Sequence, residues 1–243
     1  MSAVRGTDAH PCVLSLVIPT YNEAENIVLL LTRIDTALQG RKWELLVVDD
    51  DSPDHTFDVV ETAGLHSPNI RCLRRVGRRG LASACIEGFG ATRSPYIAVM
   101  DADLQHDEAL LPKMLDTLLA GEVELVVGSR YAKGGGIGDL SWARRVVSYA
   151  GTWLARRLLG VGLTDPMSGF FMFRRELLQR SSLGNISGSG FKILLDLVVS
   201  TRPPPSFAEL PYVFRPRHSG SSKFNAAIGL EFMRAVLKCR FEQ

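Results

Sequence analysis

The fold is indicated most directly by residues 96–105, which read YIAVMDADLQ. The first five residues are apolar or aromatic, and they predict a short strand that is buried on both faces. Directly after it, Asp101, Asp103 and Gln105 occupy alternate positions. In doubly wound α/β sheets, ligands bind beyond the carboxyl ends of the strands. These three polar residues are therefore expected at a ligand-binding edge.

Similar apolar runs recur along the chain, at residues 13–18, 45–48, 70–73 and 125–127. Segments of helical character lie between them, at residues 23–38, 56–63, 81–91 and 109–119. This alternation predicts an α/β fold with a mostly parallel sheet flanked by helices. A length of 243 residues suits a single domain over residues 1–243, with 1–12 as an N-terminal extension.

Charge is divided unevenly between the two halves of the chain. Residues 1–125 hold 11 Lys and Arg against 19 Asp and Glu (net −8), whereas residues 126–243 hold 17 against 7 (net +10). This asymmetry suggests an acidic half that handles cations and a basic half that binds anions, although ordinary surface charge is the alternative. The basic residues are not interleaved with an aromatic platform, so nucleic acid is not an expected partner.

The sequence predicts a cytoplasmic protein. Residues 1–11 lack the apolar segment of a secretory signal. No run reaches the roughly 18 apolar residues that a spanning helix needs. The four cysteines (Cys12, Cys72, Cys85 and Cys239) are scattered without a CxxC pair, which predicts free thiols in a reducing compartment.

The residues after the strand at 96–100 predict a site for a divalent cation, Mg²⁺ or Mn²⁺. In an extended segment, residues two apart point the same way, so Asp101, Asp103 and Gln105 can present three oxygens to one ion. Such an ion can bridge a diphosphate and neutralise the charge on a departing nucleotide. The alternative is an ordinary solvated loop.

Two further strand ends carry candidate nucleotide contacts. Residues 49–54 read DDDSPD, whose carboxylates can accept hydrogen bonds from a base or from ribose hydroxyls. Alternatively, Asp54 or Ser52 caps the helix that begins at Thr56. Residues 19–23 read PTYNE, in which Tyr21 can pack on a base.

Taken in order, PTYNE (19–23), VDDDSPD (48–54), DADLQH (101–106) and GSRY (128–131) resemble glycosyltransferase family 2. More narrowly, DPMSGFF (165–171) and SGSSK (219–223) resemble the dolichol- or polyprenol-phosphate mannose synthases. The resemblance covers essentially residues 13–240 and implies the GT-A nucleotide-diphospho-sugar fold. The chain departs from its relatives at Gly80-Leu81-Ala82, where Gly-Leu-Gly is common, and at His106-Asp107-Glu108, where an acidic residue often precedes Pro-Glu. Both departures concern local loop geometry.

The resemblance also implies three sets of site residues. The nucleotide-sugar site would comprise Pro19, Tyr21, Glu23, Asp50, Asp101, Ala102, Asp103, Arg217 and Lys223. The metal ligands would be Asp101, Asp103 and Gln105, and the acceptor phosphate would be bound by Arg130, Arg144 and Ser148. The expected catalytic residues are Asp103, Arg130 and Lys223.

The activity implied by the resemblance is inverting transfer of mannose from GDP-mannose to dolichyl or polyprenyl phosphate. A phosphate acceptor is already anionic at neutral pH and needs no base. A hydroxyl acceptor would need one, and His106, Asp107 and Glu108 are candidates. The alternatives are transfer of glucose, N-acetylglucosamine or an amino sugar from a UDP-sugar, and a non-catalytic scaffold that binds nucleotide-sugar. A dinucleotide-binding oxidoreductase is disfavoured because the first strand lacks a GxGxxG turn.

Two segments, about 139–163 and 224–243, predict amphipathic helices. The first combines Trp142 and Trp153 with Arg144 and other arginines, a composition suited to a lipid headgroup layer. These segments predict a protein that is peripheral on the cytoplasmic face of a membrane. A helix packed on the sheet is the alternative. A separate membrane-protein subunit is a further expected partner.

Overall fold

All five predicted strands form in the computed structural model, which describes residues 12–138, 156–157, 161–183 and 193–218. Their bounds are β1 Leu14–Thr20, β2 Trp43–Asp49, β3 Ile70–Arg74, β4 Tyr96–Val99 and β5 Leu125–Ser129. Two strands that were not predicted complete the sheet, β6 Phe171–Arg174 and β7 Phe207–Pro211.

The sheet has seven strands in the order β3-β2-β1-β4-β6-β5-β7. Strand β6 is antiparallel to both β4 and β5, while every other pair in the sheet is parallel. The predicted mostly parallel sheet is therefore confirmed. The carboxyl ends of β1, β2, β4 and β5 lie along one edge of the sheet, which positions the predicted site residues.

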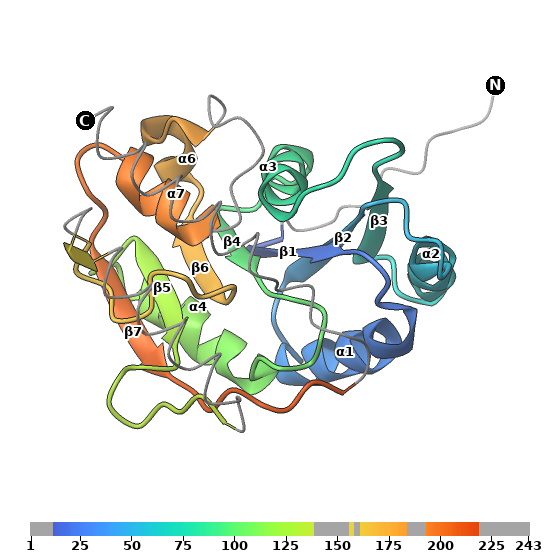
Figure 1. Ribbon diagram of the computed structural model, residues 1–243, viewed down its shortest axis with the longest axis horizontal. Coiled ribbons are helices and arrows are strands. Elements are labelled where there is room, and N and C mark those ends of the chain that lie inside the picture. Colours follow the sequence, from blue (N-terminus) through green and yellow to red (C-terminus); the bar gives the residue numbers. More distant parts are fainter. Residues whose placement is uncertain (1–11, 139–155, 158–160, 184–192, 219–243) are drawn as a thin grey trace.

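Helices cover both faces of the sheet (Figure 1). Their bounds are α1 Ala24–Ala37, α2 Thr56–His66, α3 Leu81–Ala91, the 3₁₀ helix η1 Glu108–Leu110, α4 Leu111–Leu119, α6 Glu176–Arg180 and α7 Ile193–Ser200. The first four predicted helices correspond to α1, α2, α3 and the η1–α4 pair. Helices α1, α2 and α4 pack on one face, and α3, α6 and α7 pack on the other.

Alternation along the strands divides the core into two hydrophobic clusters. In β1, Leu16 and Ile18 face the cluster under α1 and α4, while Val17 faces the cluster under α3 and α7. Helix α3 lies so close to β1 that a Cβ added at Gly88 would overlap the side chain of Val17. The sheet is thus buried on both faces, as the uninterrupted apolar runs of its strands require.

The predicted amphipathic segments are only partly described. Residues 156–157 are helical, but 161–163 are not, and Val161 and Leu163 are buried in the cluster under α7. The predicted extent of the first segment, to about residue 163, was therefore wrong at its end, because these apolar residues pack into the core. The second segment, 224–243, lies outside the described residues.

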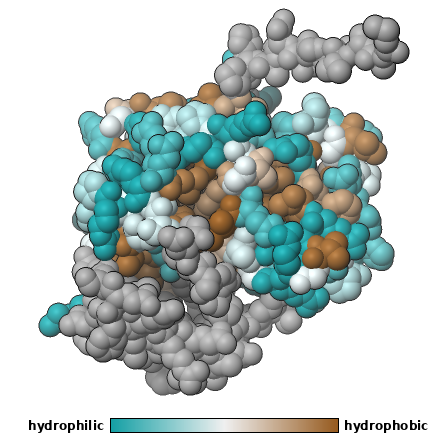
Figure 2. Space-filling view, turned by 90° about the horizontal axis from the view of Figure 1, so that it is seen from above, coloured by the Kyte–Doolittle hydropathy of each residue, from teal (hydrophilic) through white to brown (hydrophobic). Residues whose placement is uncertain are grey.

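Within the described residues, no helix combines the length and the apolar character that crossing a membrane requires. Figure 2 shows one face of the molecule, on which hydrophobic residues gather near the middle and hydrophilic residues border them. Cys12, Cys72 and Cys85 are free thiols, as predicted. Cys239 lies outside the described residues.

Candidate functional site

The acidic loop after β2 is held mainly by contacts within the protein. Asp49 is fully buried and accepts hydrogen bonds from Thr20 Oγ1 (2.9 Å) and from the backbone nitrogen of Ser52 (2.9 Å). Asp54 accepts hydrogen bonds from the backbone nitrogens of Ala24 and Thr56, both at 3.0 Å. Asp54 therefore accepts the first backbone N–H groups of both α1 and α2, although the residue at the N-cap position of α2 is His55.

Asp50, a predicted nucleotide contact, is fixed by a buried arginine. Its Oδ1 lies 2.5 Å from Arg75 Nη1, and its Oδ2 accepts a hydrogen bond from the Gly80 nitrogen at 2.7 Å. Arg75 is only 1% exposed and also donates to Glu87 and Ser83. A carboxylate has about four lone-pair positions. Two of these positions thus remain on Asp50 to accept hydrogen bonds from a ribose or a base. The nucleotide role of Asp50 stays a prediction.

Tyr21 and Glu23 lie in the loop that joins β1 to α1. The guanidinium of Arg79 lies 4.3 Å from the centre of the Tyr21 ring, within cation–π range. Glu23 accepts a hydrogen bond from Asn26 and lies 3.9 Å from Arg217 Nη1. Pro19, near the end of β1, pairs with Val48 in the register between β1 and β2. The PTYNE segment therefore borders both the acidic loop and Arg217.

The predicted metal residues follow β4. Asp103 Oδ1 accepts a hydrogen bond from the backbone nitrogen of Gln105 (3.1 Å), and its Oδ2 accepts one from Arg217 Nη2 (2.7 Å). Burial and the charge of Asp101 raise the pKa of Asp103 above its usual value. Ala102 between them is 3% exposed and contributes its backbone alone to any polar contact. The structure therefore brings Asp101, Asp103 and Arg217 together, and their roles toward a metal and a nucleotide stay predictions.

Arg215 fixes the loop that follows these residues. The Gln105 side-chain nitrogen donates to the Arg215 carbonyl oxygen at 3.0 Å. The Arg215 guanidinium pairs with Asp107 (2.6 Å) and with Glu108 (2.7 Å). Asp107 and Glu108 were candidate bases for a hydroxyl acceptor. These ion pairs favour a structural role for both.

The chemistry of the Asp101–Asp103 pair fits a divalent cation. Carboxylate oxygens are the ligands that Mg²⁺ and Mn²⁺ prefer. Burial, followed by the charge of Asp101, raises the pKa of Asp103, and a bound cation would offset both effects. Among the described residues, no group of three or more His, Cys, Asp or Glu side chains is arranged to hold a metal. Two carboxylates and Gln105 would therefore need diphosphate oxygens and water to complete the coordination, which is usual for Mg²⁺.

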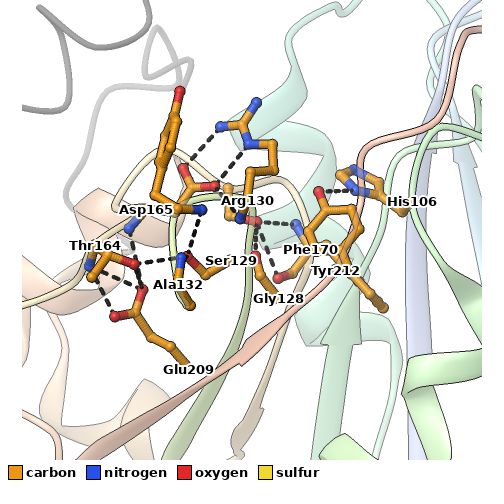
Figure 3. A network of polar contacts seen from close by, with 12 residues as sticks. His106, Gly128, Ser129, Arg130, Ala132, Thr164, Asp165, Phe170, Glu209 and Tyr212 are labelled. Carbon is orange, nitrogen blue, oxygen red and sulfur yellow. Dashed lines mark hydrogen bonds and ion pairs between the residues drawn. The ribbon is translucent and has the colours of Figure 1, made fainter. Parts of the chain in front are cut away.

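A network of polar contacts fixes Arg130 at the end of β5 (Figure 3). Arg130 Nε and Nη2 donate to the two carboxylate oxygens of Asp165 at 2.7 and 2.8 Å. Asp165 is fully buried, and its backbone nitrogen donates to Glu209 at 3.2 Å. Glu209 also accepts from the backbone and the hydroxyl of Thr164. The network therefore ties β5, the 164–170 loop and β7 to the orientation of one arginine.

Arg130 remains available to a ligand only in part. Its side chain is 13% exposed. Burial alone would lower its pKa, but the hydrogen bonds and the charge of Asp165 raise that pKa above its ordinary value. The guanidinium is therefore a permanent cation at the site. Arg144, Ser148 and Lys223, the other predicted anion-binding residues, lie outside the described residues, so their roles stay predictions.

Several residues of this site were not singled out from the sequence. Asp165 stood in the quoted DPMSGFF motif without a role of its own, and Arg75 was not assigned one. One signal was available for Glu209, which places a charge inside an otherwise apolar, β-prone run at 207–212. A charged residue within a strand often marks a buried polar contact.

Comparison with family models gives one match that spans most of the site. The model of Glycosyl transferase family 2 matches residues 15–181. The match runs from the second residue of β1 to beyond β6, and it includes the acidic loop, the Asp101–Asp103 pair and the Arg130–Asp165 pair.

Curated relatives resemble the chain over nearly its whole length. The dolichol-phosphate mannosyltransferase of Pyrococcus furiosus is 37% identical over 227 residues, which cover 93% of this chain and 63% of that protein. The dolichol-phosphate mannosyltransferase of Saccharomyces cerevisiae is 34% identical, with 91% and 85% covered. The undecaprenyl-phosphate mannosyltransferase of Micrococcus luteus is 35% identical, with 87% of each chain covered. The chain thus spans less than two thirds of the Pyrococcus protein.

Solved structures with the same fold include glucosyl-3-phosphoglycerate synthase from Mycobacterium tuberculosis. Its complex with Mg²⁺ and UDP matches with a TM-score of 0.72 at 21% identity, covering 95% of this chain and 80% of that one. Its complex with Mn²⁺, UDP and glucosyl-3-phosphoglycerate matches with a TM-score of 0.68 at 22% identity, with the same coverage. At this identity the likeness establishes the fold, which is the predicted GT-A arrangement.

Proposed function

Because this chain belongs to glycosyl transferase family 2, we propose that it transfers mannose from GDP-mannose to a dolichyl or polyprenyl phosphate. The observation that carries the proposal is the contact between Asp103 and Arg217 at the end of β4. This contact places the Asp101–Asp103 pair, which could bind a cation, next to the Arg217 guanidinium. A bound cation and a guanidinium would together neutralise the charge of a nucleoside diphosphate. The names of the curated relatives support mannose and a lipid phosphate as the transferred group and the acceptor.

The described residues divide the work between donor and acceptor. Asp50 and Tyr21 would bind the nucleoside. The Arg217 guanidinium would exchange its ion pair with Asp103 for one with the diphosphate, whose charge it would offset. A divalent cation bound by Asp101, Asp103 and Gln105 would supply further neutralisation of the leaving group. Arg130, oriented by Asp165, would bind the acceptor phosphate with its remaining donors.

No catalytic base is required in this reaction. The second pKa of a phosphate monoester is about 6, so the attacking oxygen is already anionic at neutral pH. The ion pairs of Asp107 and Glu108 with Arg215 agree with a site that needs no base. Catalysis then consists of aligning two anions against fixed positive charges, and direct displacement inverts the anomeric carbon.

A membrane surface is the proposed location of the acceptor. The segment at about 139–160 would dock the protein on the cytoplasmic face through its tryptophans and arginines, and the segment 224–243 would do so through its apolar and basic residues. A double Trp142→Ala and Trp153→Ala variant should bind anionic liposomes more weakly than the unmodified chain. Equal binding by the two proteins would contradict this part of the proposal.

The test of the proposed function is transfer of radiolabelled sugar to a short polyprenyl phosphate with Mn²⁺ or Mg²⁺, and with a chelator. GDP-mannose, UDP-glucose and UDP-N-acetylglucosamine serve as parallel donors. We expect metal-dependent labelling from GDP-mannose. Labelling from a UDP-sugar alone would show that the donor is a UDP-sugar and not GDP-mannose. Nucleotide binding without transfer from any donor would favour the scaffold alternative.

Matched variants show whether the assigned site is responsible. Asp103→Asn should lower transfer by about 100-fold or more, because several kcal/mol of charge stabilisation are lost. Asp116→Asn, which alters an exposed carboxylate on α4, should leave transfer unchanged. Full activity of Asp103→Asn would remove Asp103 from the site.

A further inference from the structure

His106 lies buried between two oxygen atoms that belong to different parts of the chain. Its Nε2 lies 3.2 Å from Asp101 Oδ2. Its Nδ1 lies 2.8 Å from the Tyr212 hydroxyl (Figure 3). Both His106 and Tyr212 are 4% exposed. Tyr212 directly follows β7, whereas Asp101 and His106 follow β4. The histidine thus connects a predicted metal ligand to the segment that follows the edge strand β7.

The direction of these two hydrogen bonds follows from the acceptors. An ionised carboxylate only accepts hydrogen bonds, so Nε2 of His106 carries the hydrogen and donates it to Asp101. In the neutral ring, Nδ1 is then an acceptor, and the Tyr212 hydroxyl donates to it. Burial raises the pKa of Tyr212, so the hydroxyl keeps its proton.

Aromatic side chains hold the imidazole ring in place. The ring centre of His106 lies 5.3 Å from that of Phe170 and 5.7 Å from that of Phe214. Phe170 is itself fully buried. With neighbours on these sides and a hydrogen bond at each nitrogen, the ring has one well-defined orientation.

The main chain confines the Asp101 carboxylate from another direction. A Cβ added at Gly169 would lie 2.5 Å from Asp101 Oδ2, so only glycine leaves room for this carboxylate. The Asp101 side chain is nevertheless 38% exposed. Oδ2 is therefore enclosed by His106 and Gly169, while part of the side chain faces solvent, from which a cation and a diphosphate would approach.

We propose that His106 and Tyr212 are positioning residues that orient the Asp101 carboxylate for a divalent cation. The inference rests on the proposed function, because it takes Asp101 as a ligand of the cation. Hydrogen bonds that orient metal ligands from outside typically contribute 10- to 100-fold to metal affinity. The Asp101–His106–Tyr212 chain is such an arrangement, with the hydrogen bonds running toward the carboxylate.

Three substitutions separate positioning from packing. His106→Gln can place its side-chain nitrogen near the position of Nε2 and so keep a donor to Asp101. His106→Asn is shorter and places its polar atoms near Nδ1, which removes that donor. Tyr212→Phe removes one oxygen atom and leaves the aromatic packing in place.

The measurement is binding of Mn²⁺, followed by the electron paramagnetic resonance signal of the free ion, with GDP and in a parallel series with UDP. We expect the Kd for Mn²⁺ to rise about 10- to 100-fold in His106→Asn. It should rise less in Tyr212→Phe, and His106→Gln should stay nearest to the unmodified chain. Nucleotide affinity in chelator and the melting temperature without metal provide controls, and both should change little in Tyr212→Phe and His106→Gln.

The Asp101→Asn variant distinguishes failure of this inference from failure of the proposed site. If Asp101→Asn loses Mn²⁺ while His106→Asn and Tyr212→Phe bind it as tightly as the unmodified chain, the positioning role is wrong and the cation site stands. If the unmodified chain does not bind Mn²⁺, or Asp101→Asn binds it normally, both ideas are overturned.

Discussion

The Arg130 guanidinium is bound in parallel by both carboxylate oxygens of Asp165, at 2.7 and 2.8 Å. The pair is largely withdrawn from water, since the two side chains are 13% and 0% exposed. Arg41 and Asp116 form a second two-point pair, but their side chains are 34% and 55% exposed. The chain therefore contains two ion pairs of similar geometry and different burial.

Breaking the buried pair should cost far more stability than breaking the exposed one. Asp165→Asn leaves a buried arginine without its countercharge, and we expect the free energy of unfolding to fall by about 3 kcal/mol or more. Asp116→Asn should lower it by less than about 1 kcal/mol. Urea unfolding of the two variants measures both quantities. Similar losses in the two variants would contradict the importance assigned to burial.

Arg130→Lys tests whether the orientation of the guanidinium matters for the acceptor. Lysine keeps the positive charge but cannot make the parallel pair with Asp165. We expect the KM for polyprenyl phosphate to rise about tenfold, the equivalent of roughly 1.4 kcal/mol, while the KM for the donor stays unchanged. Steady-state kinetics with each substrate varied separately provide the measurement. An increase confined to the donor KM would show that Arg130 binds the nucleotide-sugar and not the acceptor phosphate.

Asp54→Ala should destabilise the protein by about 1–2 kcal/mol, because the first turns of α1 and α2 lose a shared acceptor. Asp58→Ala is a suitable control, since Asp58 lies in the first turn of α2 but its side chain is 64% exposed and pairs with exposed His55. Thermal unfolding should separate the two variants. Equal melting temperatures would show that the Asp54 contacts contribute little.

Asp196 on α7 should make stability depend on pH. Burial raises its pKa to about 6, above the value of about 3.9 in an unfolded chain. One of its oxygens is buried and has no hydrogen-bond partner in the described structure. The folded state therefore holds the proton more tightly than the unfolded state does. Below about pH 4 the carboxyl is protonated in both states, and its burial then costs the least stability. Stability falls as the pH rises toward about 6 and stays lower above it.

Asp196→Asn removes this titration. The variant should be more stable than the unmodified chain at pH 8, by at most about 3 kcal/mol, and this difference should shrink to about 1 kcal/mol at pH 4.5. Asp35→Asn on the exposed side of α1 serves as the control and should show no such trend. A stability difference that is the same at both pH values would exclude Asp196 as its source.

The strands and helices that the sequence predicted are those whose pattern is strongest. Strands β1, β2, β4 and β5 are buried on both faces, and each appears as a nearly continuous apolar run. Strand β7 was missed because it lies at an edge, carries Glu209 and has no fully buried residue. Strand β6 is as short as β4 but runs antiparallel to both of its neighbours, and the regular alternation of strands and helices predicts only parallel strands.

The site was predictable where its residues follow a strand and unpredictable where they meet through tertiary packing. Asp101 and Asp103 lie at the end of β4, so their local sequence placed them. The Arg75–Asp50 and Arg130–Asp165 contacts join residues 25 and 35 positions apart. Spacing along the chain contains no information about such contacts, because loop paths decide which charges meet.

The antiparallel strand between β4 and β5 has a consequence for synthesis of the chain. Strand β5 reaches β4 only through β6, whose residues 171–174 are made more than forty positions after β5 ends. On a growing chain, the edge of β4 therefore stays without its partner until β6 has left the ribosome, and such edges are prone to pair wrongly. We expect the acidic half to fold first as a four-stranded unit, and the basic half to join it late.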